Sequence, residues 1–371
     1  MRCTVRRTII NYSRAFIKKE RSMAIFPLVG LCQSELMKQR EKRRRISFCI
    51  GSLWVGLMLS GCSLASEPKL EQPYSFEDRP FLLSDNTIQE SVVVPLFAQD
   101  LCVVSDESAY NPEDVDSEAA ILCSLSDNSV RYSKNAFERL YPASTTKVMT
   151  ALIAIKYGNL DDIVTVTEDA VISEAGATLS GIQPGDVLTM RQLLYGLMLP
   201  SGNDAGAAIA VHMSQNIEAF AELMNEEARR IGATGTHFVN PHGLHDENHY
   251  TTAYDLYLIF QEALKYPEFR EVTKTTAFIA NYKDKDGNEI SKTWEGGNWY
   301  LTGQRETPEG LTVFSGKTGT TQAAGCCLVM GTRAGESQEN GGDEYISVIM
   351  KADTRNKLYE NMTNIISKIV N

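Results

Sequence analysis

The 371-residue sequence lacks several features that would place it quickly in a class of proteins. It has no CxxC pair and no regular Cys/His spacing, so its cysteines do not predict a zinc site. Its longest apolar run falls short of the roughly 20 residues that a membrane-spanning helix needs. It has no internal repeat and no collagen-like or disordered bias, with 43% hydrophobic and 22% charged residues. These absences leave an ordinary globular chain with room for one large domain or two smaller ones.

Basic charge is scarce outside the N-terminal part of the chain. Residues 1–61 hold 13 Lys/Arg and 3 Asp/Glu, whereas the remaining residues hold 23 basic and 44 acidic side chains. A nucleic-acid-binding protein would need a basic face, so the acidic body argues against a nucleic-acid partner. A solvated acidic surface that keeps the protein soluble is the simpler interpretation.

The basic N-terminal part resembles an export signal. Four consecutive basic residues, 42–45, precede an apolar run of 15 residues, Ile46–Ser60. The run ends in "LSGC", Leu59–Cys62, which resembles the lipobox of bacterial lipoproteins. That resemblance implies that Cys62 is lipidated, becomes the mature N-terminus and holds the protein on the outer face of the cytoplasmic membrane. An ordinary cleaved signal and an uncleaved anchor are the alternatives.

The rest of the domain plan follows from composition. Met37 opens a complete signal by itself, which favours it as the true start and residues 1–36 as a mis-called extension. The stretch from Cys62 to residue 97 is polar and contains four prolines, which is typical of a tether. We therefore divide the chain into a leader (1–61), a tether (62–97) and one folded catalytic domain (98–371).

Hydrophobic periodicity predicts mixed secondary structure in the folded domain. Residues 119–135 read as two strands around a Ser-Asp-Asn turn. Helical spacing is present in four further segments: residues 144–158, 185–199, 204–230 and 251–264. Two strands, residues 326–333 and 344–352, precede a final helix from about Asn356. Strands at both ends predict a sheet whose first and last strands are neighbours, with a helical region inserted between them.

The stretch "YPASTTKVMTALIAIKYG", residues 141–158, places Ser144 and Lys147 three residues apart. On a helix these side chains project from the same face. A serine in the first turn lies among unsatisfied N–H groups, which can stabilise an oxyanion. A buried lysine beside it can act as the base if its pKa is lowered. Alone the pattern is weak, because a Ser N-cap followed by a surface lysine is a commoner arrangement.

Two other stretches strengthen the catalytic interpretation. "LPSGNDAG" places Ser201 and Asn203 in a loop that opens a helix. "FSGKTGTTQAAG" places Lys317 and Thr318 just before or on a strand, where Gly319 lets the backbone approach a ligand closely. Together the three stretches provide a nucleophile, a base, a second hydroxyl, an amide and a second cation. This set fits acyl transfer on a substrate that ends in a carboxylate.

In this order the motifs S-x-x-K, S-x-N and K-T-G resemble those of the serine penicillin-binding proteins and β-lactamases. Their wider context is similar to the low-molecular-mass D-alanyl-D-alanine carboxypeptidases over residues 98–371. The resemblance implies an α+β fold of the β-lactamase/transpeptidase type, with an antiparallel sheet flanked by helices and an inserted all-helical subdomain. Many members carry a further C-terminal β-rich domain, which we do not expect in this chain.

The resemblance also implies a role for each catalytic residue. Ser144 is the nucleophile that forms the acyl-enzyme, and Lys147 accepts its proton. Ser201 relays a proton to the departing D-alanine. Asn203 holds the amide of the substrate and helps to fix Lys147. No metal and no organic cofactor is implied.

A second set of residues is expected to bind the substrate. Lys317, Thr318 and Thr320 are expected to bind the terminal carboxylate, with Gly319 between them. The backbone N–H groups of Ser144 and Thr320 would form the oxyanion hole.

The resemblance implies removal of the terminal D-alanine from peptidoglycan pentapeptide stems, with β-lactam antibiotics as inhibitors. Endopeptidase or transpeptidase activity on crosslinks uses the same chemistry and remains open. A β-lactamase is disfavoured, because the chain lacks a Glu-x-x-Leu-Asn loop after the middle motif. A catalytically inactive wall-binding protein is disfavoured because all motif residues are present.

Histidines and cysteines invite other interpretations. Four histidines cluster in residues 236–250, but the family carries a similar Asn-Pro-x-Gly loop without metal, so we expect none here. A Cys102–Cys123 bridge is compatible with an exported protein, although sequence does not establish it. Adjacent Cys326 and Cys327 are expected to pack on a strand.

Overall fold

The computed structural model describes residues 101–104, 114–338 and 341–370. The proposed leader, the tether, Met37 and Cys62 lie outside these residues, so the predictions about export and lipidation stay predictions. Within the described ranges, no helix combines the length and the apolar character that crossing a bilayer requires.

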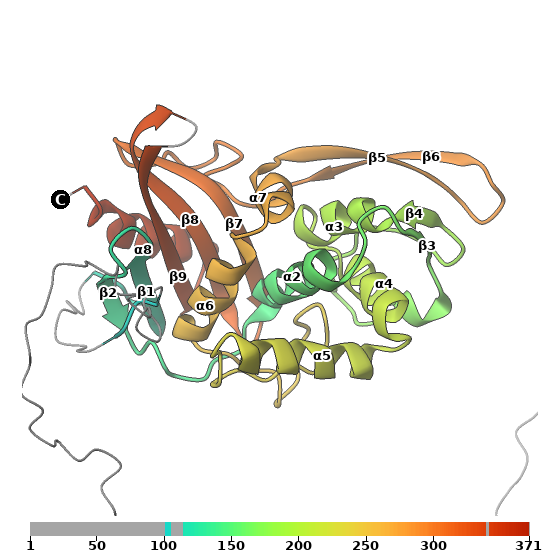
Figure 1. The fold of residues 1–371 in the computed structure, drawn as a ribbon, viewed down its shortest axis with the longest axis horizontal. Coiled ribbons are helices and arrows are strands. Elements are labelled where there is room, and N and C mark those ends of the chain that lie inside the picture. Colours follow the sequence, from blue (N-terminus) through green and yellow to red (C-terminus); the bar gives the residue numbers. More distant parts are fainter. Residues whose placement is uncertain (1–100, 105–113, 339–340, 371) are drawn as a thin grey trace, which may run out of the picture. The chain divides into compact units, whose positions relative to one another are not determined.

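The main sheet has five antiparallel strands in the order β2-β1-β9-β8-β7. Their bounds are β1 Ala119–Ser124, β2 Val130–Lys134, β7 Leu311–Thr321, β8 Gly325–Gln338 and β9 Gly341–Ala352. Ile121 of the first strand lies opposite Val348 of the last. The prediction that the first and last strands are neighbours is therefore confirmed, and β7 forms the edge at which the sheet meets the helical region (Figure 1).

Alternating side chains give this sheet two apolar faces, because successive strand residues point to opposite sides. Ala120 and Leu122 pack in the cluster that contains the final helix α8, Arg355–Ser367. Ile121 and Cys123 pack in the cluster that contains the helices of the other layer. Figure 1 accordingly shows α8 on one face of the sheet and α6 on the other.

The helical region surrounds the buried helix α2, Lys147–Tyr157. The helices that follow are α3 Met190–Met198, α4 Asn203–Ser214, α5 Ile217–Arg230, α6 Ala253–Ala263 and α7 Pro267–Lys274. The stretch 204–230 forms two helices and not one, because Gln215 adopts a left-handed conformation (φ 70°). Asn216 then caps α5 by accepting a hydrogen bond from Ala219 N.

The prediction of an all-helical insert is wrong in one respect. A second sheet has the order β3-β4-β5-β6, with β3 Ile163–Thr165, β4 Val187–Thr189, β5 Ala277–Lys283 and β6 Glu289–Glu295. The long β5–β6 hairpin is largely exposed. Polar residues predominate in β6, and in β5 (AFIANYK) apolar residues are consecutive, so no apolar alternation marked the hairpin. Trp294 anchors the hairpin, because its indole N–H donates to Ser180 O at 3.0 Å.

The cysteines of the folded domain are buried. Cys326 and Cys327 pack on β8, as the sequence predicted. Cys102 and Cys123 are free thiols in this structure. Burial raises the pKa of the Cys123 thiol, and the neighbouring Cys102 adds to the effect.

Candidate active site

Ser144 lies in a tight 3-10 turn, Ala143–Thr146, that leads directly into α2. Ala143 has φ +48°, a region that residues with a Cβ rarely adopt. The hydroxyl of Thr145 donates to Pro142 O at 2.7 Å, and that of Thr146 donates to Ala143 O at 2.8 Å. These two bonds hold the turn in its strained form.

Lys147 is completely buried directly behind Ser144. Its Nζ lies 3.0 Å from Ser144 Oγ, 2.6 Å from Asn203 Oδ1 and 2.7 Å from the carbonyl oxygen of His242. Burial lowers the pKa of Lys147 well below its usual value, and the charge of Lys317 lowers it further. A neutral amine fits the contacts, because its two hydrogens serve the two carbonyl oxygens and its lone pair faces the serine hydroxyl.

Lys317 approaches the same centre from β7. Its Nζ donates to Ser201 Oγ and to Thr318 O, both at 3.0 Å. Burial, reinforced by the charge of Arg355, lowers the pKa of Lys317 to about 7. Within the described ranges, no carboxylate forms an ion pair with Lys147 or Lys317. The two lysines thus have no ion-pair partner, and the charge of Asp204 only partly opposes the lowering of the Lys147 pKa.

The middle motif links the two lysines. Ser201, at φ +63°, lies in the loop between α3 and α4 and meets Lys317, whereas Asn203 starts α4 and meets Lys147. Buried Asp204 accepts hydrogen bonds from the backbone N–H groups of residues 180, 181 and 182 at 2.8, 2.7 and 3.2 Å. This carboxylate therefore fixes the start of α4 against the neighbouring loop.

Strand β7 passes directly in front of the turn that holds Ser144. A Cβ placed on Gly319 would lie 2.7 Å from Ser144 N and 2.9 Å from Thr145 N, so a side chain at this position would displace the turn. Lys317 and Thr318 line the same pocket, although neighbouring residues of a strand point to opposite sides. The Thr320 hydroxyl is directed to Cys326 Sγ at 3.7 Å. The eight predicted site residues thus lie on one turn, one loop and one strand that meet.

The loop formed by residues 239–243 supports the turn from behind. Pro241 O accepts a hydrogen bond from Thr150 Oγ1 at 2.6 Å, and the next carbonyl along the chain is the one that Lys147 contacts. Gly243 has φ +86°, and a Cβ there would lie 1.8 Å from Ala143 O. Only glycine allows this approach.

Arg355 is a site residue that the sequence analysis missed. It is the first residue of α8, and its guanidinium lies 5.1 Å from the ring centroid of Trp299 and donates to Gly297 O. A Cβ on Gly297 would lie 3.4 Å from Arg355 Nη2 and 3.8 Å from Thr318 Oγ1, so both side chains border the space beside Gly297. One feature of the sequence could have drawn attention to Arg355. A basic residue is unfavourable in the first turn of a helix, because the helix dipole is positive there, so its presence suggests another role.

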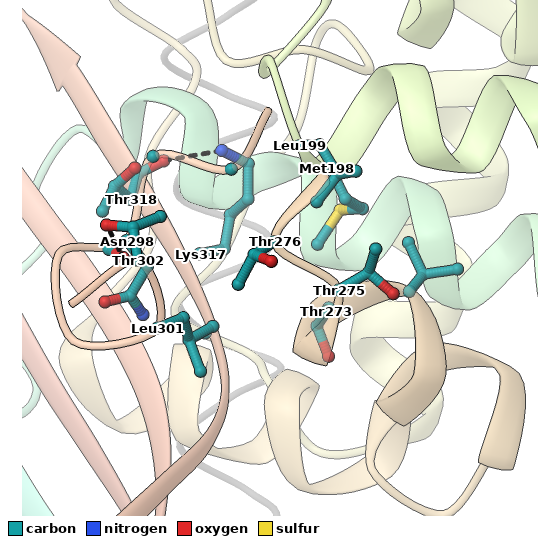
Figure 2. A pocket seen from close by; sticks show the side chains of 14 residues that line it. Met198, Leu199, Thr273, Thr275, Thr276, Asn298, Leu301, Thr302, Lys317 and Thr318 are labelled. Carbon is teal, nitrogen blue, oxygen red and sulfur yellow. Dashed lines mark hydrogen bonds between the residues drawn. The ribbon is translucent and has the colours of Figure 1, made fainter. Parts of the chain in front are cut away.

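A small pocket opens beside Lys317 (Figure 2). Hydroxyl and amide side chains form much of its lining: Thr273, Thr275, Thr276, Asn298, Thr302 and Thr318. Together with Arg355, this lining makes the end of the site beyond Lys317 polar and positively charged, as binding of an anionic group requires.

The histidine cluster has other partners. His237 Nδ1 lies 2.6 Å from Asn248 O, and both ring nitrogens of His249 contact protein atoms. In the part of the chain that the structure describes, no group of three His, Cys, Asp or Glu side chains could hold a metal ion.

Comparison with known sequences identifies a family. The profile of peptidase S11, D-alanyl-D-alanine carboxypeptidase, matches residues 106–354. D-alanyl-D-alanine carboxypeptidase DacF of Bacillus subtilis is 32% identical over 243 residues, which are 64% of this chain and 58% of that protein. DacC of Escherichia coli is 32% identical over 258 residues, 67% of this chain and 60% of that protein. The chain therefore spans about three fifths of the length of these curated relatives.

Comparison with solved structures identifies the same fold. The crystal structure of the Streptomyces K15 DD-transpeptidase matches with a TM-score of 0.62 and 30% identity, covering 68% of this chain and 97% of that one. The α+β fold of the β-lactamase/transpeptidase type is therefore confirmed.

The close approach at Gly243 yields a stability prediction. Gly243→Ala and Gly287→Ala both put a side chain on a glycine of positive φ (+86° and +83°), but the new Cβ meets nothing within 4 Å at Gly287. We expect Gly287→Ala to lower the free energy of unfolding by about 1–2 kcal/mol, from backbone strain alone. Gly243→Ala should cost clearly more, because Ala143 must also move. Urea denaturation checks this, and equal losses would contradict the proposed contact.

Proposed function

The chain belongs to the D-alanyl-D-alanine carboxypeptidase family, and we propose that it removes the terminal D-alanine from the pentapeptide stems of peptidoglycan. The observation that carries this proposal is the buried lysine with a lowered pKa, 3.0 Å from Ser144 Oγ, facing a second cation on β7. Such a pair supports a serine nucleophile whose substrate supplies a negative charge close to the reacting bond.

In the acylation step, Ser144 Oγ attacks the carbonyl carbon of the bond between the two D-alanines, and its proton passes to neutral Lys147. The N–H groups of Ser144 and Thr320 receive the negative oxygen of the tetrahedral intermediate. Ser201, bonded to Lys317, passes on to the leaving amine the proton that Lys147 accepted, so Lys147 is neutral again once the C–N bond has broken. Free D-alanine departs and the shortened peptide remains as an ester on Ser144.

In the deacylation step, a water molecule attacks the ester and gives a proton to Lys147. The C–O bond to Ser144 breaks, Oγ recovers a proton, and the tetrapeptide stem leaves with a new carboxylate. Asn203 holds Lys147 at 2.6 Å throughout and offers its amide N–H group to the peptide. Apart from this water molecule, the proposed steps use side chains and backbone groups of the protein.

Recognition of the terminal carboxylate is assigned to Lys317, Thr318 and Arg355, with Gly319 and Thr320 continuing the strand beside the substrate. The pocket of Figure 2 lies at this end of the site. Charge-assisted hydrogen bonds to a carboxylate are among the stronger polar contacts in proteins. They would explain why a C-terminal D-alanine is selected. A β-lactam antibiotic carries a comparable carboxylate and would acylate the same serine.

A second candidate is transfer of the acyl group to an amine, or its reverse on crosslinked peptides. The matching Streptomyces K15 structure is described as a DD-transpeptidase, whereas a K15 protein 34% identical to this chain over 222 residues is described as a carboxypeptidase. The same acyl-enzyme serves both reactions, with an amine replacing water as the acceptor.

We further propose that the enzyme is exported and held on the outer face of the cytoplasmic membrane by a lipid on Cys62. In this plan residues 62–97 are the tether that carries the catalytic domain of residues 98–371. The sequence "LSGC" after a basic and apolar leader supports this proposal.

The first functional prediction concerns the nucleophile. When residues 63–371 are incubated with a muramyl pentapeptide ending in D-Ala-D-Ala, mass spectrometry should show the loss of one alanine. Ser144→Ala should abolish this loss, while Ser126→Ala, in the turn between β1 and β2, should not. An unchanged pentapeptide with the wild-type protein would contradict carboxypeptidase activity. Covalent labelling by penicillin in that case would point to the crosslinked substrate.

The second functional prediction separates binding from proton transfer. Arg355→Gln should raise KM about tenfold with little change in kcat, because a charged hydrogen bond to the carboxylate is lost. Removing this charge also raises the pKa of Lys317 above its value of about 7, so the alkaline limb of kcat/KM should move to higher pH.

A matched control for this variant is Lys357→Gln on the same helix, because Lys357 pairs with Asp116 and Glu360. It should leave both KM and the pH profile unchanged. An unaltered KM in Arg355→Gln, or an identical shift in the control, would overturn the assignment of Arg355 to the carboxylate.

The third functional prediction concerns anchoring. Bacteria expressing the full chain in medium with labelled palmitate should yield a labelled protein in the membrane fraction. Cys62→Ala should remove the label, whereas Cys49→Ala, within the apolar run, should keep it. Label that persists in Cys62→Ala would rule out the proposed lipidation site.

A further inference from the structure

The peptide unit between Ala143 and Ser144 connects the back of the turn to the reaction centre. In a trans peptide the C=O and the following N–H point in opposite directions. Ala143 O faces the supporting loop, where it accepts from Thr146 Oγ1 at 2.8 Å and lies against Gly243. Ser144 N faces β7, where Gly319 approaches it. The direction of this carbonyl therefore decides where the N–H of Ser144 points.

A histidine controls the hydrogen bond that holds this carbonyl. His249 Nε2 lies 2.8 Å from Thr146 Oγ1, and His249 Nδ1 accepts a hydrogen bond from Val239 N at 3.1 Å. Because Nδ1 is an acceptor, these partners assign the proton of a neutral imidazole to Nε2. His249 then donates to Thr146, and the single hydroxyl proton of Thr146 is left for Ala143 O.

The surroundings of His249 keep it neutral. The residue is 1% exposed and packs edge-on against Phe238 at 5.5 Å between ring centroids. Burial lowers the pKa of His249 to about 3, against an opposing influence of Asp246. The imidazole therefore keeps one proton and one direction of donation over the whole physiological pH range.

We propose that His249 is a positioning residue: through Thr146 it fixes the plane of the Ala143–Ser144 peptide and so directs the N–H of Ser144 into the oxyanion hole. The inference rests on the proposed function, since it concerns the same acyl-transfer site. It assigns a purpose to the positive φ of Ala143, because that conformation turns the carbonyl away from the substrate and toward Thr146.

The hydrogen-bond chain from His249 through Thr146 to Ala143 O differs from simple packing in what it requires of each residue. Packing requires only a side chain of similar volume at positions 146 and 249. The hydrogen-bond chain requires a hydrogen-bond donor at position 249 and a hydroxyl at position 146. Matched pairs of variants therefore separate the two explanations: His249→Phe keeps a ring without a donor, Thr146→Val keeps the shape without a hydroxyl, and Thr146→Ser keeps the hydroxyl.

The decisive measurement is the acylation of Ser144 by a fluorescent penicillin under single-turnover conditions. We expect Thr146→Val and His249→Phe to lower the acylation rate constant about 100-fold, the order of effect of losing an oxyanion donor, with the dissociation constant of the initial complex changed less than about threefold. Thr146→Ser should stay within about threefold of wild type. Wild-type acylation rates in Thr146→Val and His249→Phe would overturn the proposal. If His249→Phe fails to fold, the two Thr146 variants decide alone.

A second measurement does not depend on activity. In protein labelled with ¹⁵N-histidine, His249 should show the tautomer protonated at Nε2 and should not titrate between pH 5 and 8. The tautomer protonated at Nδ1, or titration near pH 6.5, would overturn the proposed hydrogen-bond chain. Absence of both penicillin acylation and peptide trimming in the wild-type protein would instead refute the proposed function, and the tautomer would still decide whether the hydrogen-bond chain exists.

Discussion

Two buried lysines that share one small site are the constraint on which the rest of this structure depends. Lys147 and Lys317 are each less than 4% exposed, and in the described residues neither has a carboxylate partner. Burying two uncompensated ammonium groups side by side would be very costly, so the pair favours loss of a proton from Lys147. Lys147 comes from the helical layer and Lys317 from the edge strand of the sheet. The contact between these two parts thus lowers the pKa of Lys147, which favours the proposed role of this lysine as a base.

The contact between the helical layer and β7 also requires the turn of residues 143–146 to keep a fixed shape. Glycines close it from two sides, because Gly319 of β7 lies against Ser144 N and Gly243 lies against Ala143 O. Ala143 and Ser201 both adopt positive φ values beside the reacting groups. Strain of this kind persists only where the surroundings over-determine the backbone. Here the surroundings are the hydroxyls of the turn and the loop of residues 239–243 behind it. A rigid loop therefore fixes the direction of the Ser144 N–H group.

Sequence reasoning succeeded where chemistry and spacing are local. Ser144 and Lys147 are three residues apart and Asn203 opens a helix, so short motifs predicted side chains that the structure brings into contact, while their catalytic roles stay predictions. The pairing of the first strand with the last was also predicted, because both lie in apolar segments at the ends of the folded region. The predicted helix of residues 251–264 is likewise present as α6, and Thr252 caps it by accepting a hydrogen bond from Asp255 N.

The features that sequence reasoning missed depend on contacts between distant segments. Arg355 reaches the site only because α8 starts beside the loop of residues 296–298, and its own neighbours in sequence do not mark it. His249 meets Thr146 across 103 residues, and the sequence analysis assigned no role to its cluster. The β5–β6 hairpin pairs with β4 across a long sequence gap and buries little of its surface, and apolar and polar residues do not alternate along β5, so periodicity did not reveal it.

Charge links substrate recognition to catalysis in this arrangement. A carboxylate bound by Thr318 and Arg355 would lie close to Lys317 and would favour its protonated form, which opposes the lowering of the pKa of Lys317 by burial. A protonated Lys317 in turn keeps the pKa of Lys147 low, because the two cations repel each other. The negative end of the substrate would therefore hold Lys147 in the neutral form that accepts the proton of Ser144. A peptide without that carboxylate would lose binding energy and would also leave the base less well prepared, so selectivity would appear in kcat as well as in KM.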